Sequence, residues 1–174
     1  ACQVLEQIQV RPTDRVIVLG DGKLGLLVAQ VVALTGCDLV AVGRHAEKLA
    51  ILAARGVATQ LDGAEIEGGA DLVIECTGQR EGFRRARELV RPRGTLVLKS
   101  TYHGDQVPTD LSRVVVDEIR VLGSRCGPFP PAIRLLSQGL VDVLPLVEAE
   151  YPLDEALAAF EHAGRRGALK VLVR

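Results

Sequence analysis

The chain has 174 residues, of which 48% are hydrophobic, and its formal net charge at pH 7 is −1. This length predicts one domain with a full hydrophobic core, and the near-neutral charge gives no general attraction to nucleic acid or to an acidic membrane. No apolar run approaches the roughly 20 residues that cross a bilayer, and no signal-like segment opens the chain, so we expect a soluble, cytoplasmic protein without membrane contact.

The chain contains no methionine and begins at Ala1, which indicates a piece of a longer protein. Its four cysteines, at positions 2, 37, 76 and 126, form no C-x-x-C pair and lack the spacing of a metal site. Three of them lie in or beside apolar segments. We therefore expect mostly buried free thiols.

After a helical stretch over residues 1–9, residues 15–44 contain a strand, a glycine turn, a helix and a second strand. The apolar run 16–19 predicts a buried strand. The next helix has Leu24 and valines at 28, 31 and 32 at the i, i+4, i+7, i+8 spacing of one apolar face, and it ends before Gly36. The run 38–42 predicts the second strand.

The turn between this strand and this helix has the pattern G-x-G-x-x-G. Gly20 permits the tight bend, Gly22 lets the backbone approach a pyrophosphate, and Gly25 lets the helix pack closely on the strand. Backbone N–H groups and the dipole at the helix start favour the phosphate charge. Because the motif lies between a strand and a helix, it predicts dinucleotide binding rather than a merely structural turn.

Strands and helices alternate along the rest of the chain. We expect strands at residues 57–61, 70–76, 95–99, 119–123, 147–151 and 169–173, and helices at 46–55, 80–90 and 130–138 and from 153 onwards. A polar loop with one short helical stretch fills residues 100–118. The alternation predicts an α/β fold with a doubly wound parallel sheet and helices on both faces. The arginines around the helix at 80–90 indicate a solvated face, since no aromatic residues interleave with them.

The placed segments resemble the coenzyme domain of the medium-chain dehydrogenase/reductase superfamily, the zinc-type alcohol dehydrogenase-like enzymes. The matching segments are VIVLGDGKLGLLVAQ, VAVGRHAEKLA, DLVIECTG, RPRGTLVLKST and PLDEALAAFEHAGRRGALKVLV. The resemblance implies a Rossmann domain over residues 1–150. It also implies a closing helix and strand over 151–174 that pack on a catalytic domain.

In this superfamily the catalytic domain carries the zinc ligands, including a cysteine and a Gly-His-Glu stretch, and neither occurs here. The histidines at 45, 103 and 162 show no metal spacing. We therefore assign no metal ligand and no catalytic residue to this chain, and we expect zinc only in the catalytic domain.

The end of the second strand indicates which coenzyme is preferred. An NAD site usually has an Asp or Glu about twenty residues after the glycines. This chain has Gly43, Arg44 and His45 there. Gly43 makes room for a 2′-phosphate and Arg44 can pair with it, a charge-assisted bond worth about 1.5–3 kcal/mol. We expect NADP(H) to be preferred, with NAD(H) as the alternative, and Lys48 either assists or faces solvent.

The resemblance places further residues near the coenzyme. Cys76, Thr77 and Gly78 would lie beside the ribose and nicotinamide, with the segment after Leu98 near the nicotinamide. Lys99 there replaces a small or apolar family residue. It either tunes the electrostatics of the nicotinamide ring or contacts substrate, or it points to solvent. The candidate coenzyme-binding residues are Gly20, Gly22, Lys23, Leu24, Gly25, Gly43, Arg44, His45, Lys48, Cys76, Thr77, Gly78, Lys99, Ser100, Thr101 and Lys170, the last matching a family residue that reaches the pyrophosphate.

The resemblance implies an NAD(P)-dependent oxidoreductase that transfers hydride between an alcohol and a carbonyl compound, with this chain presenting the coenzyme. A zinc-free quinone or enoyl reductase-type member and a non-catalytic nucleotide-sensing domain are the alternatives. A methyltransferase also usually has an acid after the second strand, and a short-chain dehydrogenase needs Tyr-x-x-x-Lys, which neither tyrosine provides. The segment Ile119–Ser124 resembles the edge strand through which family members form dimers, so we expect a homodimer.

Overall fold

The computed structural model describes residues 1–102 and 111–174. Its centre is a six-stranded sheet in the order β3-β2-β1-β4-β5-β6, and every neighbouring pair is parallel. The strands are β1 (Arg15–Leu19), β2 (Asp38–Gly43), β3 (Ala58–Leu61), β4 (Ala70–Glu75), β5 (Val90–Leu98) and β6 (Arg120–Gly123). The strand order reverses between β1 and β4, which is the topology of a Rossmann fold and confirms the predicted doubly wound sheet.

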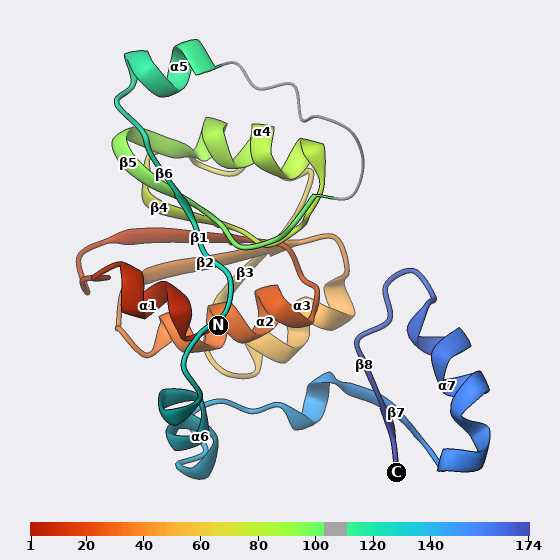
Figure 1. The fold of residues 1–174 in the computed structure, drawn as a ribbon. Coiled ribbons are helices and arrows are strands. Elements are labelled where there is room, and N and C mark those ends of the chain that lie inside the picture. Colours follow the sequence, from red (N-terminus) through yellow and green to blue (C-terminus); the bar gives the residue numbers. More distant parts are fainter. Residues whose placement is uncertain (103–110) are drawn as a thin grey trace.

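Helices cover both faces of this sheet, with α2 and α3 on one face and α4 on the other (Figure 1). The helices are α1 (Gln3–Gln7), α2 (Lys23–Ala33), α3 (Ala46–Ala53), α4 (Arg80–Leu89), α5 (Leu111–Val116) and α6 (Phe129–Ser137). The predicted loop over 100–118 is described only at its ends, and residues 103–110, with His103, lie outside the described part. Within the part that is described, no helix combines the length and the apolar character that crossing a membrane requires.

The start of β5 differs from the prediction. The sequence predicts a turn at Pro92–Gly94 before a strand at 95–99, whereas β5 already pairs with β4 from Val90. The register then shifts: Ala70 pairs with Val90 and Leu72 pairs with Thr95, so the residues around the predicted turn form a bulge in the strand. Proline lacks the N–H that a sheet ladder needs, so it fits a bulge where it does not fit a regular interior strand.

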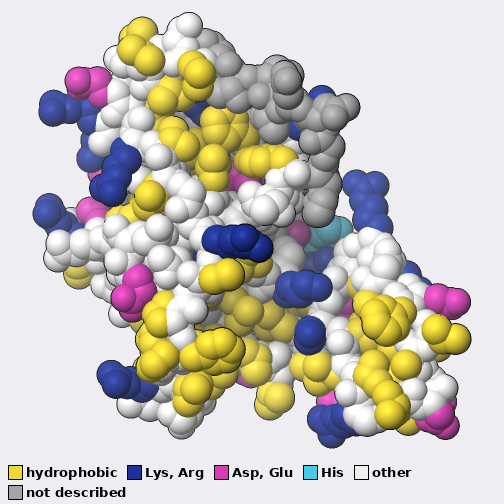
Figure 2. All heavy atoms as spheres, viewed as in Figure 1, with side chains coloured by type: hydrophobic (Ala, Val, Ile, Leu, Met, Phe, Trp, Pro, Cys, Tyr) yellow, Lys and Arg dark blue, Asp and Glu magenta, His cyan; other side chains and the backbone are white. Residues whose placement is uncertain are grey.

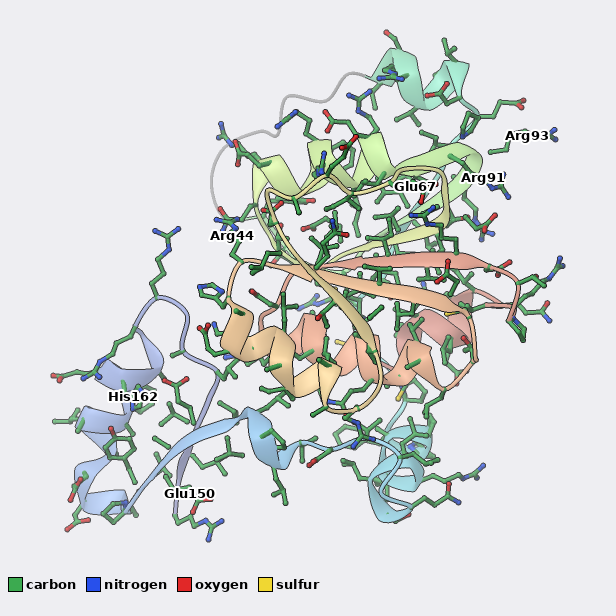
Figure 3. The ribbon with its side chains drawn as sticks, turned by 180° about the vertical axis from the view of Figure 1, so that it is seen from behind. Arg44, Glu67, Arg91, Arg93, Glu150 and His162 are labelled. Carbon is green, nitrogen blue, oxygen red and sulfur yellow. The ribbon has the colours of Figure 1, made fainter. Side chains whose placement is uncertain are left out.

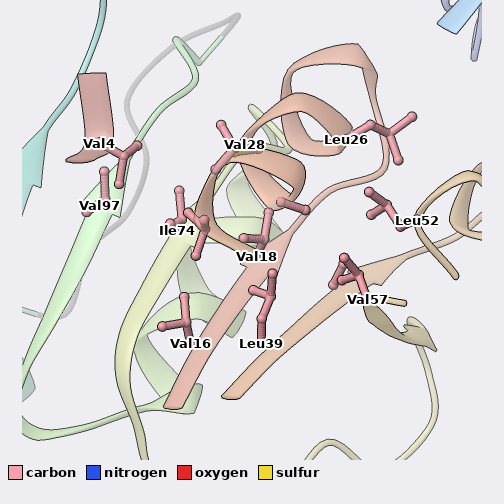
Figure 4. Packing of buried hydrophobic residues seen from close by; sticks show 14 of the residues in the cluster. Val4, Val16, Val18, Leu26, Val28, Leu39, Leu52, Val57, Ile74 and Val97 are labelled. Carbon is pink, nitrogen blue, oxygen red and sulfur yellow. The ribbon is translucent and has the colours of Figure 1, made fainter. Parts of the chain in front are cut away.

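The core consists of two apolar clusters, one on each face of the sheet. Val16 and Val18 of β1 lie in the cluster that also contains Leu26 and Val28 of α2 (Figure 4). The alternate residues of β1, Ile17 and Leu19, lie in the other cluster, which packs against α4. Successive side chains of a strand point to opposite faces, so a continuously apolar run suits a strand that is covered on both sides.

The C-terminal residues 147–174 form a small unit of their own, called here the closing unit. Its strands β7 (Val147–Tyr151) and β8 (Lys170–Val173) pair in parallel, apart from the main sheet, and are joined by α7 (Ala156–Ala163). Short 3-10 turns, η1 (Leu144–Leu146) and η2 (Leu153–Glu155), precede β7 and α7. Apolar side chains of α7 remain uncovered within the described chain (Figure 2): Leu157 is 82% exposed and Phe160 is 75% exposed.

Candidate functional site

A cleft of about 920 Å³ opens at the carboxyl end of the sheet. It is bordered by the turn after β1, the end of β2, the start of α4 and the loop before β8. Open α/β sheets bind their ligands outside the carboxyl ends of the strands, at the place where the strand order reverses. The predicted residues that line the cleft are Gly20, Gly22, Gly43, Arg44, His45, Lys48, Cys76 and Thr77.

The glycine turn is held tightly against the neighbouring strand and helix. The Gly20 N–H donates to the carbonyl oxygen of Val42 at 2.8 Å. A Cβ built on Gly25 would lie 1.9 Å from the carbonyl oxygen of Gly20, so only glycine fits at position 25. Gly22 is the N-cap of α2, and a Cβ built on it would meet no atom within 4 Å. The first N–H groups of α2 have no partner inside the helix and are available to an anion.

Asp21, which sequence reasoning did not select, bridges the glycine turn and the end of β2. Its Oδ2 accepts hydrogen bonds from the backbone N–H of Arg44 at 2.6 Å and from that of His45 at 2.7 Å. The ring Nδ1 of His45 lies 3.0 Å from the same oxygen. A Cβ built on Gly43 would lie 2.4 Å from the Asp21 Cβ, so the space that glycine leaves free at position 43 is filled by this aspartate. The expectation that Gly43 makes room for a 2′-phosphate is therefore corrected, because the room is taken by the Asp21 side chain.

The Asp21 carboxylate is stabilised in its ionised form. Its side chain is 11% exposed, and burial raises the pKa of Asp21. The hydrogen bonds from His45 and Arg44 outweigh burial, so the pKa of this carboxyl is lowered from its ordinary value. An ionised carboxylate can only accept hydrogen bonds, so the His45 ring donates through Nδ1–H and leaves Nε2 free of this bond.

Cationic side chains from four separate segments line the same cleft, and those of α4, Arg84 and Arg85, pair with Glu88. Arg44 follows β2, and its Nε lies 3.7 Å from Asp62 Oδ2. Lys48 of α3 donates to the carbonyl oxygen of Gly167, which ties the loop before β8 to α3. Arg166, from the same loop, also lines the cleft, and no sequence pattern indicated it. Figure 3 shows Arg44 on the side of the sheet where the closing unit lies, away from Arg91 and Arg93.

Glu75, the last residue of β4, organises the loop that contains Thr77 and Gly78. It is fully buried, and its Oε1 accepts from the backbone N–H of Thr77 at 2.6 Å, from the Thr77 hydroxyl, and from the N–H of Gly78 at 3.2 Å. Its Oε2 accepts from the Tyr102 hydroxyl at 3.0 Å. Sequence reasoning missed Glu75, although a charged residue inside the apolar run ADLVIEC is a signal that could have found it.

Two groups beside Glu75 have raised pKa values. Burial, together with the Glu75 charge, raises the pKa of the Cys76 thiol to about 12, so this thiol stays neutral at the lip of the cleft. Burial and the same carboxylate raise the pKa of Tyr102 above its ordinary value, so its hydroxyl remains a hydrogen-bond donor.

Other predicted residues lie outside this lining. Lys99 is 7% exposed, and its Nζ donates to Ser124 Oγ at 3.3 Å and to the carbonyl oxygen of Arg125; burial lowers its pKa. The amine is therefore buried rather than solvent-facing, and its effect on a nicotinamide stays a prediction. The predicted coenzyme-binding residues that do not line the cleft are Lys23, Leu24, Gly25, Gly78, Lys99, Ser100, Thr101 and Lys170. Their contacts with a coenzyme stay predictions.

The described residues contain no group of three His, Cys, Asp or Glu side chains that could hold a metal ion. Two of the histidines lie in separate units. His45 contacts Asp21, whereas His162 in the closing unit lies 2.9 Å from the Tyr151 hydroxyl and 3.0 Å from Glu148 Oε1 (Figure 3).

Comparison with protein-family models matches residues 24–138 to the zinc-binding dehydrogenase family. A protein of Rhizobium meliloti (strain 1021) that is assigned as a D-xylulose reductase is 33% identical over 168 residues, which cover 88% of this chain and 48% of that protein. A sorbitol dehydrogenase of Halalkalibacterium halodurans is 27% identical over 186 residues, which cover 97% of this chain and 54% of that enzyme. The chain thus spans about half the length of the curated relatives it matches.

Solved structures agree with these matches. A protein described as a zinc-binding dehydrogenase from Sinorhizobium meliloti 1021, with NADP bound, superposes with a TM-score of 0.81 at 28% identity, over 97% of this chain and 54% of that one. A protein described as a short chain alcohol dehydrogenase from Escherichia coli CFT073, in complex with NADH, has a TM-score of 0.85 at 20% identity, over 99% of this chain and 55% of that one. The second likeness concerns the fold alone.

Proposed function

This chain belongs to the zinc-binding dehydrogenase family, and from that premise we propose that it is the coenzyme-binding part of an NADP(H)-preferring oxidoreductase that interconverts a polyol and its carbonyl compound. The coarser part of this statement, a coenzyme-binding domain of a polyol or alcohol dehydrogenase-like oxidoreductase, follows from the relatives. The preference for NADP(H) and the reaction of the whole protein are the proposal.

The observation that carries the proposed preference is the set of basic side chains around the end of β2. Arg44, His45 and Lys48 line one side of the cleft, and Arg166 borders it from the closing unit. A 2′-phosphate adds about two negative charges to the adenosine ribose, and guanidinium groups bind phosphate through paired N–H donors. The NADP held by the Sinorhizobium meliloti relative supports the same coenzyme.

When bound, the nicotinamide supplies the hydride chemistry. The glycine turn and the start of α2 bind the pyrophosphate, and Thr77 lines the cleft near the switch between β1 and β4. The described residues do not fit a catalytic zinc ion, since they contain no cluster of metal-ligating side chains. Metal analysis of the longer protein would separate a zinc enzyme from a zinc-free reductase of the same superfamily.

Calorimetric titration of this chain with NADPH and NADH tests the proposed preference. We expect NADPH to bind more tightly, and Arg44→Ala to weaken NADPH binding by roughly tenfold or more while NADH binding changes little. Arg134→Ala, which removes an exposed arginine of α6 away from the cleft, is the matched control. Equal or tighter binding of NADH, unchanged by Arg44→Ala, would reject the preference.

The substrate class has its own test. We expect the longer protein that contains this chain to oxidise polyols such as sorbitol with NADP⁺ faster than simple alcohols or quinones. Activity on quinones or enoyl compounds alone would favour the zinc-free alternative, and tight nucleotide binding without turnover of any of these substrates would favour a nucleotide-sensing domain.

A further inference from the structure

Asp21 connects two segments that are far apart in the sequence. It lies between Gly20 and Gly22, yet its carboxylate reaches the residues that follow β2, 23 and 24 positions further along the chain. The three hydrogen-bond donors around its Oδ2 all belong to Arg44 and His45. One carboxylate oxygen thus connects the turn that faces a pyrophosphate with the segment that faces the adenosine ribose.

A carboxylate at the end of β2 has two chemical roles open to it. It can accept the ribose hydroxyls of NAD, or it can hold the protein backbone. The first role requires oxygens that are open to the ligand, but the Asp21 side chain is only 11% exposed and Oδ2 is already surrounded by three N–H donors. Those donors offset the negative charge that would repel a 2′-phosphate. The observations therefore favour the second role.

Holding this backbone fixes the direction of two side chains that the ribose would meet. His45 is the N-cap of α3 with extended backbone (φ −116°, ψ 107°), and its ring is oriented by the bond through Nδ1. Its Nε2 lies 4.0 Å from the position that a Cβ on Gly167 would occupy, so the ring is directed towards the loop that also carries Arg166. Arg44, whose side chain is 52% exposed, lies on the same segment.

We propose that Asp21 is a positioning residue for coenzyme selection, which holds the backbone of Arg44 and His45 so that the Arg44 guanidinium and the His45 ring meet the 2′-phosphate of NADP(H). This inference rests on the proposed function, since it assigns a cause to the preference for the 2′-phosphate. Gly43 is part of the same arrangement, because any side chain at that position would displace the aspartate.

The experiment compares Asp21→Ala and Asp21→Asn with the unchanged chain, using calorimetric titration with NADPH and with NADH. Asp21→Ala removes the acceptor, and we expect NADPH binding to weaken by roughly tenfold while NADH binding changes by less than about threefold. Asparagine keeps an oxygen acceptor in nearly the same place, so Asp21→Asn is expected to retain most of the selectivity. Asp154→Ala, in the exposed part of the closing unit, is the control for loss of an aspartate.

Hydrogen exchange provides a second readout that does not depend on which coenzyme is preferred. We expect the amide protons of Arg44 and His45 to exchange faster in Asp21→Ala, with the rest of the sheet unchanged. Unchanged exchange at these two amides would overturn the positioning role. Tighter NADPH binding and weaker NADH binding in Asp21→Ala would also overturn it, because the carboxylate would then bind the ribose hydroxyls directly. A preference of the unchanged chain for NADH would instead reject the proposed function, separately from the exchange result.

Discussion

The carbonyl oxygen of Gly20 lies so close to Gly25 that a Cβ built on Gly25 would be 1.9 Å from it. The neighbouring atom belongs to the backbone of the turn, so it cannot move aside as the end of a flexible side chain would. The contact brings α2 against the end of β1, and it therefore sets the place where the first N–H groups of the helix face the cleft.

Gly25→Ala is expected to destabilise the chain by about 1–3 kcal/mol, because the added methyl group overpacks the junction between helix and strand. Urea unfolding followed by circular dichroism measures the change. Gly22→Ala is the matched control: its Cβ would meet no atom within 4 Å, so the free energy of unfolding should change little. Its methyl group should instead obstruct the approach of a pyrophosphate and weaken NADPH binding. Equal stability of both variants would contradict this account of the turn.

We expect replacement of Glu75 to lower the free energy of unfolding more than replacement of a glutamate on the surface. Glu75→Ala leaves the N–H groups of Thr77 and Gly78 and the Tyr102 hydroxyl without their acceptor, and each buried donor without a partner costs about 1–3 kcal/mol. We expect a loss of about 3 kcal/mol or more in the free energy of unfolding, together with weaker coenzyme binding because the Thr77 loop lines the cleft. Glu161→Ala on the exposed side of α7 is the control, and similar losses in the two variants would contradict the role of Glu75.

Local patterns were sufficient to predict most elements of the fold, but not the start of β5. The apolar run in β1 predicts a covered strand, and the glycine turn predicts the start of a helix. Both signals lie within a few consecutive residues, so they can be recognised in the sequence. The aspartate at position 21 was missed because its partners lie 23 and 24 residues away and its own neighbours indicate only a turn. The sequence did not decide whether Lys99 is buried or faces solvent, for the same reason. The acceptors of its amine, Ser124 Oγ and the carbonyl oxygen of Arg125, belong to a later segment.

The lowered pKa of Asp21 makes part of the stability dependent on pH. The pKa in the folded chain lies below the ordinary value of 3.8, so the unfolded chain binds more protons around that pH. The stabilisation is fully present above pH 3.8 and is lost as the pH falls through the folded-state pKa. Asp21→Asn removes this dependence. The difference in unfolding free energy between the unchanged chain and Asp21→Asn should therefore shrink below pH 3.8 in urea titrations, and a difference that grows on acidification would contradict the assignment.

The cysteines are expected to differ strongly in reactivity. The thiolate is the reactive form, and burial with the adjacent Glu75 charge raises the pKa of Cys76 to about 12, so this thiol should not react in the folded chain. Cys126 is exposed and should react first. Iodoacetamide labelling followed by mass spectrometry of the peptides distinguishes the two, with labelling in urea as the control for full access. Modification of Cys76 at the rate of Cys126 in the folded chain would contradict the burial of this thiol.

The edge strand β6 is the element on which the predicted homodimer depends. It ends the sheet order, and Val121 on it is 42% exposed. An exposed apolar edge offers unpaired backbone groups to a second copy, and a lysine there discourages such pairing. Val121→Lys is therefore expected to shift the chain from dimer to monomer in sedimentation equilibrium. Val173→Lys, which changes a valine of β8 that is 41% exposed, should leave the assembly unchanged. A monomer at high concentration for the unchanged chain would remove the prediction, and loss of the dimer in both variants would place the interface elsewhere.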